Sequence, residues 1–273
     1  MNMHPRPRHA SSDWQRDLVP TGTDLFGLLC RPLAHAPRAT CVVLLNAGFM
    51  PRSGPFRLHV RLARGLAMRG YPVFRFDLPG IGDSLAYADR PQTDIVRGVF
   101  DALERETGCT RFVAGGICSA ANLAWRVALA DPRMVGAVLV DAVARRTFAY
   151  RLGQLRRARY KSWAAWRDHL GRLLRPGTGS GSADLSQWPE PGSERSQMEA
   201  LVRRGVELFF LYTGGTSYFL HRGQFIGTFG QATRAECVHF EHWHRCDHLF
   251  YDETDRDDLI EAIGAWLEER LPE

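Results

Sequence analysis

The sequence lacks the features that place a chain in a membrane or in an oxidising compartment. No apolar run approaches the roughly 20 residues that a membrane-spanning helix requires. The first nine residues contain no apolar core of a secretory signal. The six cysteines are scattered over 273 residues without a compact spacing, which excludes a disulfide scaffold. We therefore expect reduced thiols and a cytoplasmic protein.

A glycine-rich cofactor loop is missing as well. A dinucleotide-binding loop needs three glycines at G-x-G-x-x-G spacing, because the backbone must approach the pyrophosphate closely. Gly80 and Gly82 have no third glycine at this spacing, and neither has the pair Gly115-Gly116. We therefore predict no bound cofactor.

What the chain does contain, at residues 111–125, is a short apolar run that passes into an alanine-rich helical pattern. A strand that turns directly into a helix exposes one side chain at the apex, in a strained backbone conformation. The positions two before and two after the apex must be very small, because strand and helix nearly touch there. With Cys118 at the apex, these positions are Gly116 and Ala120.

The spacing favours Cys118 over its neighbour as the apex. With Ser119 there, the position two before would be Ile117, which is too bulky for the turn. The resulting G-x-C-x-A run resembles the nucleophile elbow of the α/β-hydrolases, normally G-x-S-x-G. The alternative is a buried structural cysteine at a strand end, which is how most free cysteines are used.

Strand-like and helical patterns alternate on both sides of this elbow. Besides the elbow strand, we expect strands at 25–31, 40–46, 71–76, 136–142, 206–212 and 236–240. Helices are expected between them, and a last amphipathic helix at about 256–271. The alternation predicts an α/β fold with a mostly parallel sheet and helices on both faces. The resemblance to α/β-hydrolases implies a sheet of the eight-stranded type.

The alternation breaks between residues 143 and 205. Residues 145–175 carry ten Lys or Arg and one acid, with apolar residues at helical spacing. We expect a helical lid at 143–205, inserted between two parts of the core at 1–142 and 206–273. Its basic residues are either a solvated helical face or a surface for an anionic acyl substrate, carrier or membrane. No nucleic-acid-binding motif accompanies the charge, so nucleic acid is not an expected partner.

A thiol nucleophile needs a base, and chain order selects one of the ten histidines. In the α/β-hydrolases, the base lies in the loop between the last strand and the last helix. His248 occupies that place, directly after Asp247 and before Leu249. The alternative is a histidine of an ordinary surface loop.

The same region contains a run that could belong to a metal site. His242, His244, Cys246 and His248 stand at alternate positions, close to the H-x-H-x-D-H run of the metallo-β-lactamase fold. One inserted residue breaks the match, and only 25 residues follow, which are too few for the downstream ligands. We therefore predict no metal.

The acid that would orient the base is the least clear member of the site. Family members usually supply it just after the penultimate strand, where residues 213–217 contain no carboxylate. Asp141, at the end of the preceding strand, is a known alternative place for the acid in this fold. Asp247 is too close to the base in sequence to align with it. We select Asp141, and a Cys–His dyad without an acid stays open because a thiol ionises readily.

Acyl transfer also needs donors for the oxyanion of the tetrahedral intermediate. The first expected donor is the backbone N–H of Ser119, the residue after the nucleophile. The second is expected in the loop 46–50, where Gly48 allows a close approach and the Phe49 N–H points inward. The alternative is a strand-to-helix turn without a special role.

A wider resemblance supports a hydrolase. Residues 46–84 resemble the serine-aminopeptidase-like branch of the α/β-hydrolases, through Gly54, Arg57, Leu66, Ala67, Gly70 and the run from Arg75 to Ser84. The elbow from Gly116 to Ala121 is similar to hydrolases encoded beside exosortase and exopolysaccharide systems, which also carry cysteine at the apex. We expect an esterase, thioesterase or acyltransferase that forms an S-acyl intermediate on a small or carrier-bound acyl substrate. The alternative is a non-catalytic relative that binds a partner through the basic lid.

Overall fold

The structure of the chain is a computed structural model that describes most of its residues. The described residues are 14–18, 25–32, 37–85, 90–145, 192–216 and 218–272. Most of the predicted lid, at 146–191, lies outside them, so the division into core and lid stays a prediction. Within the described ranges, no helix combines the length and the apolar character that crossing a membrane requires.

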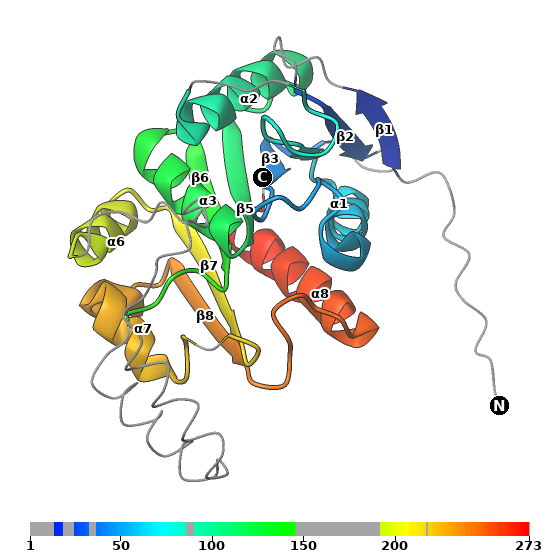
Figure 1. Cartoon of the computed structure of the whole chain (residues 1–273). Helices are drawn as coiled ribbons and strands as arrows, with labels where there is room; N and C mark the ends of the chain where they lie inside the picture. Colours follow the sequence, from blue (N-terminus) through cyan, green and yellow to red (C-terminus); the bar gives the residue numbers. More distant parts are fainter. Residues whose placement is uncertain are drawn as a thin grey trace, which may run out of the picture.

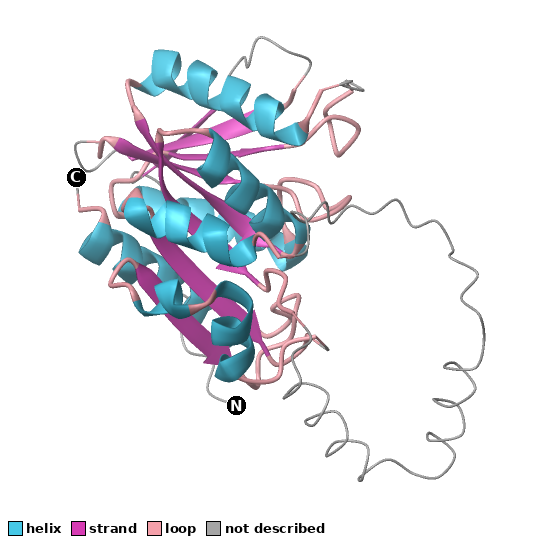
Figure 2. Ribbon diagram, turned by 90° about the vertical axis from the view of Figure 1, so that its left-hand side faces the viewer, coloured by secondary structure: helices cyan, strands magenta, loops and turns pink. Residues whose placement is uncertain are grey.

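The described strands form one eight-stranded sheet in the order β1-β2-β4-β3-β5-β6-β7-β8. The first two strands pair antiparallel with their neighbours, and all later pairs are parallel. The sheet lies between layers of helices (Figure 2). The α/β fold with a mostly parallel sheet is therefore confirmed. The strands are β1 (Trp14–Leu18), β2 (Gly27–Pro32), β3 (Thr40–Leu44), β4 (Val73–Phe76), β5 (Arg111–Ile117), β6 (Met134–Val140), β7 (Glu207–Thr213) and β8 (Val238–Trp243).

Helices cover both faces of this sheet. They are α1 (Leu58–Met68), α2 (Gln92–Thr107), α3 (Ser119–Ala130), α6 (Glu194–Arg203), α7 (Arg222–Phe229) and α8 (Glu253–Arg270), with short 3-10 helices η1 (Pro55–Arg57) and η2 (Gln231–Arg234). The helices α1 and α8 pack on one face, and α2, α3, α6 and α7 pack on the other (Figure 1). Each face therefore has its own apolar core.

The central strands belong to both cores at once. In β5, Phe112 and Ala114 point into the core beneath α2 and α3, and Val113 and Ile117 point into the core beneath α1 and α8. Side chains of a strand alternate between the faces, so a strand covered on both sides is apolar throughout. This double burial makes the sheet a rigid support for the loops at its carboxyl edge.

Several elements differ from the expectation from sequence. The strand β1 and the helix α7 were not expected, because Trp14–Leu18 is mostly polar and α7 contains Gly223 and Gly227. The last helix begins at Glu253, three residues before the predicted start. Its cap is Asp252, whose side chain accepts a hydrogen bond of 2.8 Å from the Thr254 N–H.

Candidate active site

Cys118 stands at a sharp turn between β5 and α3. Its backbone has a φ of 59° and a ψ of −117°, a strained conformation for a residue with a side chain. A Cβ added to Gly116 would lie 2.6 Å from the Ala120 Cβ and 3.0 Å from the Leu45 carbonyl oxygen. The turn therefore has the close contact between strand and helix that the sequence pattern indicates. It leaves the Cys118 thiol exposed to solvent.

His248 lies in the loop between β8 and α8, at the same edge of the sheet. Its Nδ1 is 2.7 Å from Oδ2 of Asp141, and its ring lies beside the Cys118 thiol, whose pKa it lowers. Because Asp141 occupies Nδ1, the other ring nitrogen is left to exchange a proton with the thiol. The structure thus brings the three side chains proposed from sequence together.

Asp247, the other carboxylate beside the base, has a different set of contacts. Its two side-chain oxygens accept hydrogen bonds of 2.8 Å from the N–H groups of Leu249 and Tyr251. These bonds close the turn that carries His248. The Asp247 carboxylate is therefore engaged with its own loop.

Asp141 follows β6 with a φ of 50°, and its carboxylate is completely buried. Its Oδ1 accepts a hydrogen bond of 2.7 Å from the Thr213 N–H, and its Oδ2 accepts one of 2.7 Å from the Thr213 hydroxyl. The Tyr218 hydroxyl donates to the backbone carbonyl of Asp141. Burying a carboxylate is costly unless it has such hydrogen-bond partners. Sequence reasoning missed Thr213 and Tyr218, although a polar residue ending the strand beside β6 was a usable signal.

The segment after β7, where relatives usually carry the acid, is packed against the base loop. A Cβ on Gly214 would lie 1.9 Å from the His244 carbonyl oxygen, and a Cβ on Gly215 would lie 2.5 Å from the His248 nitrogen. Neither position has room for a side chain. The carboxylate beside the imidazole is instead that of Asp141, from the neighbouring strand.

Electrostatic coupling connects the acid, the base and the thiol. The hydrogen bond that His248 donates to Asp141, and then its interaction with Cys118, raise the pKa of His248 to about 10. The hydrogen bond from His248 lowers the pKa of the Cys118 thiol, against the opposing effect of burial. Both shifts favour a thiolate beside an imidazolium, which is the reactive form of such a pair.

The loop 46–50 approaches the elbow from β3. Gly48 has a φ of 55°, and its N–H donates a hydrogen bond of 2.7 Å to Oγ of Ser119. The Ser119 N–H is directed at the Cys118 sulfur. Among the described residues, no acceptor pairs with the Phe49 N–H, and the Phe49 side chain is 73% exposed. The Phe49 N–H is therefore uncommitted, while that of Gly48 is occupied by Ser119.

Buried polar contacts fix this loop in place. The Asp77 carboxylate accepts hydrogen bonds from the Asn46 side chain at 3.3 Å and from the Arg52 N–H at 2.6 Å. Asn46 in turn accepts from the Leu78 N–H and donates to the Met50 carbonyl, both at 2.8 Å. The two ends of the loop are thus tied to the segment after β4, which gives Asp77 a structural role.

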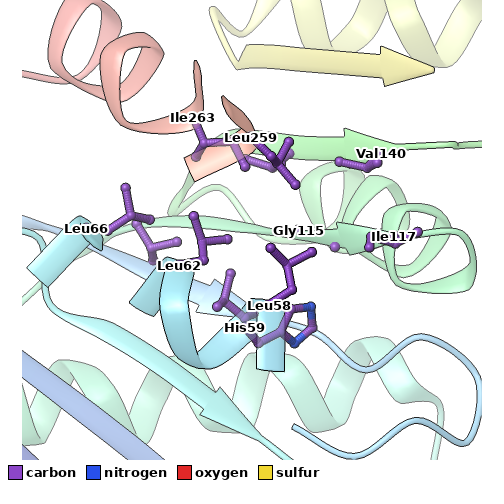
Figure 3. Close-up of a pocket in the computed structure, with 13 residues that line it drawn as sticks. Leu58, His59, Leu62, Leu66, Gly115, Ile117, Val140, Leu259 and Ile263 are labelled. Atoms are coloured by element: carbon purple, nitrogen blue, oxygen red, sulfur yellow. The ribbon is translucent and has the colours of Figure 1, made fainter. Parts of the chain in front are cut away.

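A small cavity of about 20 Å³ lies away from this cluster, between the sheet and the helices α1 and α8 (Figure 3). Its lining is apolar apart from His59, and it includes neither Cys118 nor His248. Within the part of the chain that the structure describes, no three His, Cys, Asp or Glu side chains are arranged to hold a metal ion. The side chains suited to catalysis therefore lie at the carboxyl edge of the sheet and not in this cavity.

Comparison with known proteins agrees with this fold. The model of the alpha/beta hydrolase family matches residues 42–262, which is most of the chain. The chain belongs to this family. No curated protein matches the sequence.

Several solved structures of α/β-hydrolases are similar over nearly the whole chain. An esterase from Pyrococcus furiosus is 14% identical, with 99% of this chain and 96% of that chain covered and a TM-score of 0.60. A serine hydrolase without a lid from Xanthomonas campestris is 13% identical, with coverages of 98% and 99% and a TM-score of 0.56. An esterase domain from Rhodothermus marinus is 19% identical, with coverages of 94% and 97% and a TM-score of 0.56. At these identities, the similarity shows a shared fold.

Proposed function

We propose that this α/β-hydrolase cleaves or transfers the acyl group of an ester or thioester, with Cys118 as its nucleophile. One observation carries the proposal. An exposed thiol at a strained elbow lies beside His248, which lowers its pKa, and the Nδ1 of His248 lies 2.7 Å from the buried carboxylate of Asp141. Nucleophile, base and orienting acid in this order are the arrangement that activates a nucleophile for acyl transfer.

In the first half-reaction, the Cys118 sulfur attacks the carbonyl carbon of the substrate, and its proton resides on His248. The electron pair of the carbonyl π bond moves to the oxygen, which becomes an oxyanion. The backbone N–H groups of Ser119 and Phe49 stabilise this charge. When the intermediate collapses, the bond to the leaving group breaks, and the leaving group takes the proton from His248. The product is an S-acyl enzyme.

In the second half-reaction, His248 takes a proton from water or from another acceptor, which attacks the thioester carbonyl. Collapse of the second oxyanion breaks the C–S bond and returns the proton to the Cys118 sulfur. Thioesters react readily with amines and thiols, so both hydrolysis and transfer are open to this intermediate. Asp141 keeps the imidazole oriented and stabilises its charged form in both steps.

The rim of the site suits an apolar acyl group. Phe49, which follows Gly48 in the oxyanion loop, is 73% exposed. Leu249, which follows the base His248, is 42% exposed. Large apolar side chains exposed beside a reactive group often contact ligand.

The nucleophile is tested by alkylation and by intact mass. Of the six cysteines, only Cys118 is exposed, and burial raises the pKa of the partly exposed Cys237. Iodoacetamide at limiting dose is therefore expected to label Cys118 first. Exposure to a panel of p-nitrophenyl esters and acyl thioesters is expected to add one acyl mass, which Cys118→Ala abolishes and Cys237→Ala leaves intact.

Replacement of sulfur by oxygen sharpens this test. Cys118→Ser is expected to keep little activity, because a serine hydroxyl depends far more on the oriented base than a thiol does. First labelling of Cys237 with an inert Cys118, or full turnover in Cys118→Ala, would contradict the proposal. Such a result would favour a non-catalytic relative that keeps the fold.

A further inference from the structure

The side chain of Ser119 lies next to the nucleophile. In the proposed reaction, only the backbone N–H of Ser119 takes part. Ser119 is the first residue of α3 and is half-buried. Its Oγ accepts the hydrogen bond of 2.7 Å from the Gly48 N–H, across 71 residues of sequence. The Gly48 N–H therefore serves to hold the loop and is not a donor to a substrate oxygen.

The hydroxyl proton of Ser119 is still available. A hydroxyl has one proton to donate and two lone pairs that accept, and the bond from Gly48 uses only an acceptor position. Among the residues that the structure describes, no acceptor takes the Ser119 proton. The group is thus a donor whose oxygen is fixed and whose proton can turn toward a ligand.

The position of this donor coincides with the place where charge develops. The Ser119 N–H is directed at the Cys118 sulfur, and the hydroxyl belongs to the same residue, on the side that contacts the loop of Gly48. The oxyanion forms on the carbon that becomes bonded to this sulfur. It therefore lies between the first turn of α3 and the loop that carries Phe49, where the hydroxyl also lies.

We propose that the Ser119 side chain is a third donor of the oxyanion hole. Its oxygen accepts the hydrogen bond from the Gly48 N–H and so fixes the loop that carries the Phe49 N–H. Its proton is donated to the oxyanion. This inference rests on the proposed function. A preorganised donor of this kind strengthens its bond as the carbonyl oxygen becomes negative, so it lowers the barrier more than it strengthens substrate binding.

The test compares a reaction that forms an oxyanion with one that does not. An n-hexyl trifluoromethyl ketone adds the Cys118 sulfur to its carbonyl carbon and places the electron pair on oxygen, whereas iodoacetamide alkylates the same sulfur without an oxyanion. Ser119→Ala is expected to weaken inhibition by the ketone about 10- to 100-fold and to lower kcat similarly. KM and the rate of alkylation are expected to stay within about twofold.

Two further variants complete the design. Ser119→Thr keeps the hydroxyl and is expected to recover most of the ketone affinity. Ser196→Ala removes an exposed hydroxyl that donates to the Ser193 carbonyl in the α6 region, and it is expected to behave as the wild type. Equal ketone inhibition of Ser119→Ala and wild type overturns the inference, and so does a loss of alkylation rate as large as the loss of inhibition. A wild-type protein whose Cys118 is neither acylated nor inhibited overturns the proposed function itself.

Discussion

Two histidines in this molecule are removed from water to a large extent, and their pKa values move in opposite directions. His248 lies at the carboxyl edge of the sheet beside Asp141, and its pKa is raised to about 10, chiefly by that hydrogen bond. His59 is the second residue of α1, where burial, and then the charge of Arg75, lower its pKa to about 4. The same side chain is therefore stabilised in opposite protonation states in two parts of one domain.

The difference follows from the partners of each ring. His59 is 3% exposed, lines the apolar cavity, and its Nδ1 has no hydrogen-bond partner among the described residues. Burial without a counter-charge disfavours the charged form, whereas a carboxylate at hydrogen-bond distance favours it. One buried carboxylate, held by Thr213, thus distinguishes a histidine that can carry a proton from a neutral core residue.

The most direct way to break this contrast is Asp141→Asn, which makes the surroundings of His248 resemble those of His59. The pKa of His248 is expected to fall well below about 10, and the pKa of the Cys118 thiol is expected to rise as the imidazolium is lost. Turnover should fall about 10²- to 10⁴-fold. The measurements are kcat/KM and the rate of iodoacetamide alkylation against pH, whose midpoint should move upward.

The matched control for this variant is Asp247→Asn. It alters the other carboxylate of the base loop, whose bonds to the N–H groups of Leu249 and Tyr251 an amide oxygen can partly replace. Its activity is expected to stay within about threefold of the wild type. Full activity in Asp141→Asn would leave a Cys–His dyad as the working unit.

The second variant, His59→Leu, removes the histidine that is neutral in the folded protein. The unfolded chain binds a proton near pH 6.5, and the folded pKa of His59 is about 4, so the unfolded state is protonated first as the pH falls. Stability that is fully present above about pH 6.5 is therefore lost toward pH 4. From pH 7.5 to 5, this amounts to about 2 kcal/mol of unfolding free energy.

Urea unfolding at both pH values measures this loss. His59→Leu is expected to remove about 2 kcal/mol of the acid-induced destabilisation, whatever its stability at neutral pH. Leu58→Met, which changes the lining of the same cavity without a titrating group, is expected to keep the wild-type dependence. An unchanged pH dependence in His59→Leu would show that His59 does not titrate between the two states.

The smallest expected effect concerns the residue that holds the acid. Thr213→Val removes the hydroxyl that donates to Oδ2 of Asp141, the same oxygen that His248 contacts. One such hydrogen bond contributes about 1 kcal/mol, so kcat is expected to fall about three- to tenfold. Thr213→Ser should restore it. The control is Thr216→Val, which loses a buried hydrogen bond from the Thr216 hydroxyl to the Thr213 carbonyl. It tests whether the loss of any nearby hydroxyl lowers kcat to the same extent.

Much of the fold could be predicted from sequence, since it rests on local patterns. The apolar runs of β3, β5, β6 and β7 indicate buried parallel strands because each side chain meets a core on one face or the other. The strand β1 escaped prediction because its polar residues lack this pattern, and the glycines of α7 obscure its helical period. The start of α8 was misplaced because its cap lies outside the periodic pattern.

The amino-acid sequence by itself determined the elbow, since the requirement for small residues at Gly116 and Ala120 acts within a few residues of Cys118. Only the tertiary structure decided which carboxylate reaches the base, and what the Ser119 hydroxyl does. Asp141 and His248 are 107 residues apart, and Ser119 and Gly48 are 71 apart. Such pairs meet only because neighbouring parallel strands bring their carboxyl ends to one edge, an arrangement that depends on the packing of the whole sheet.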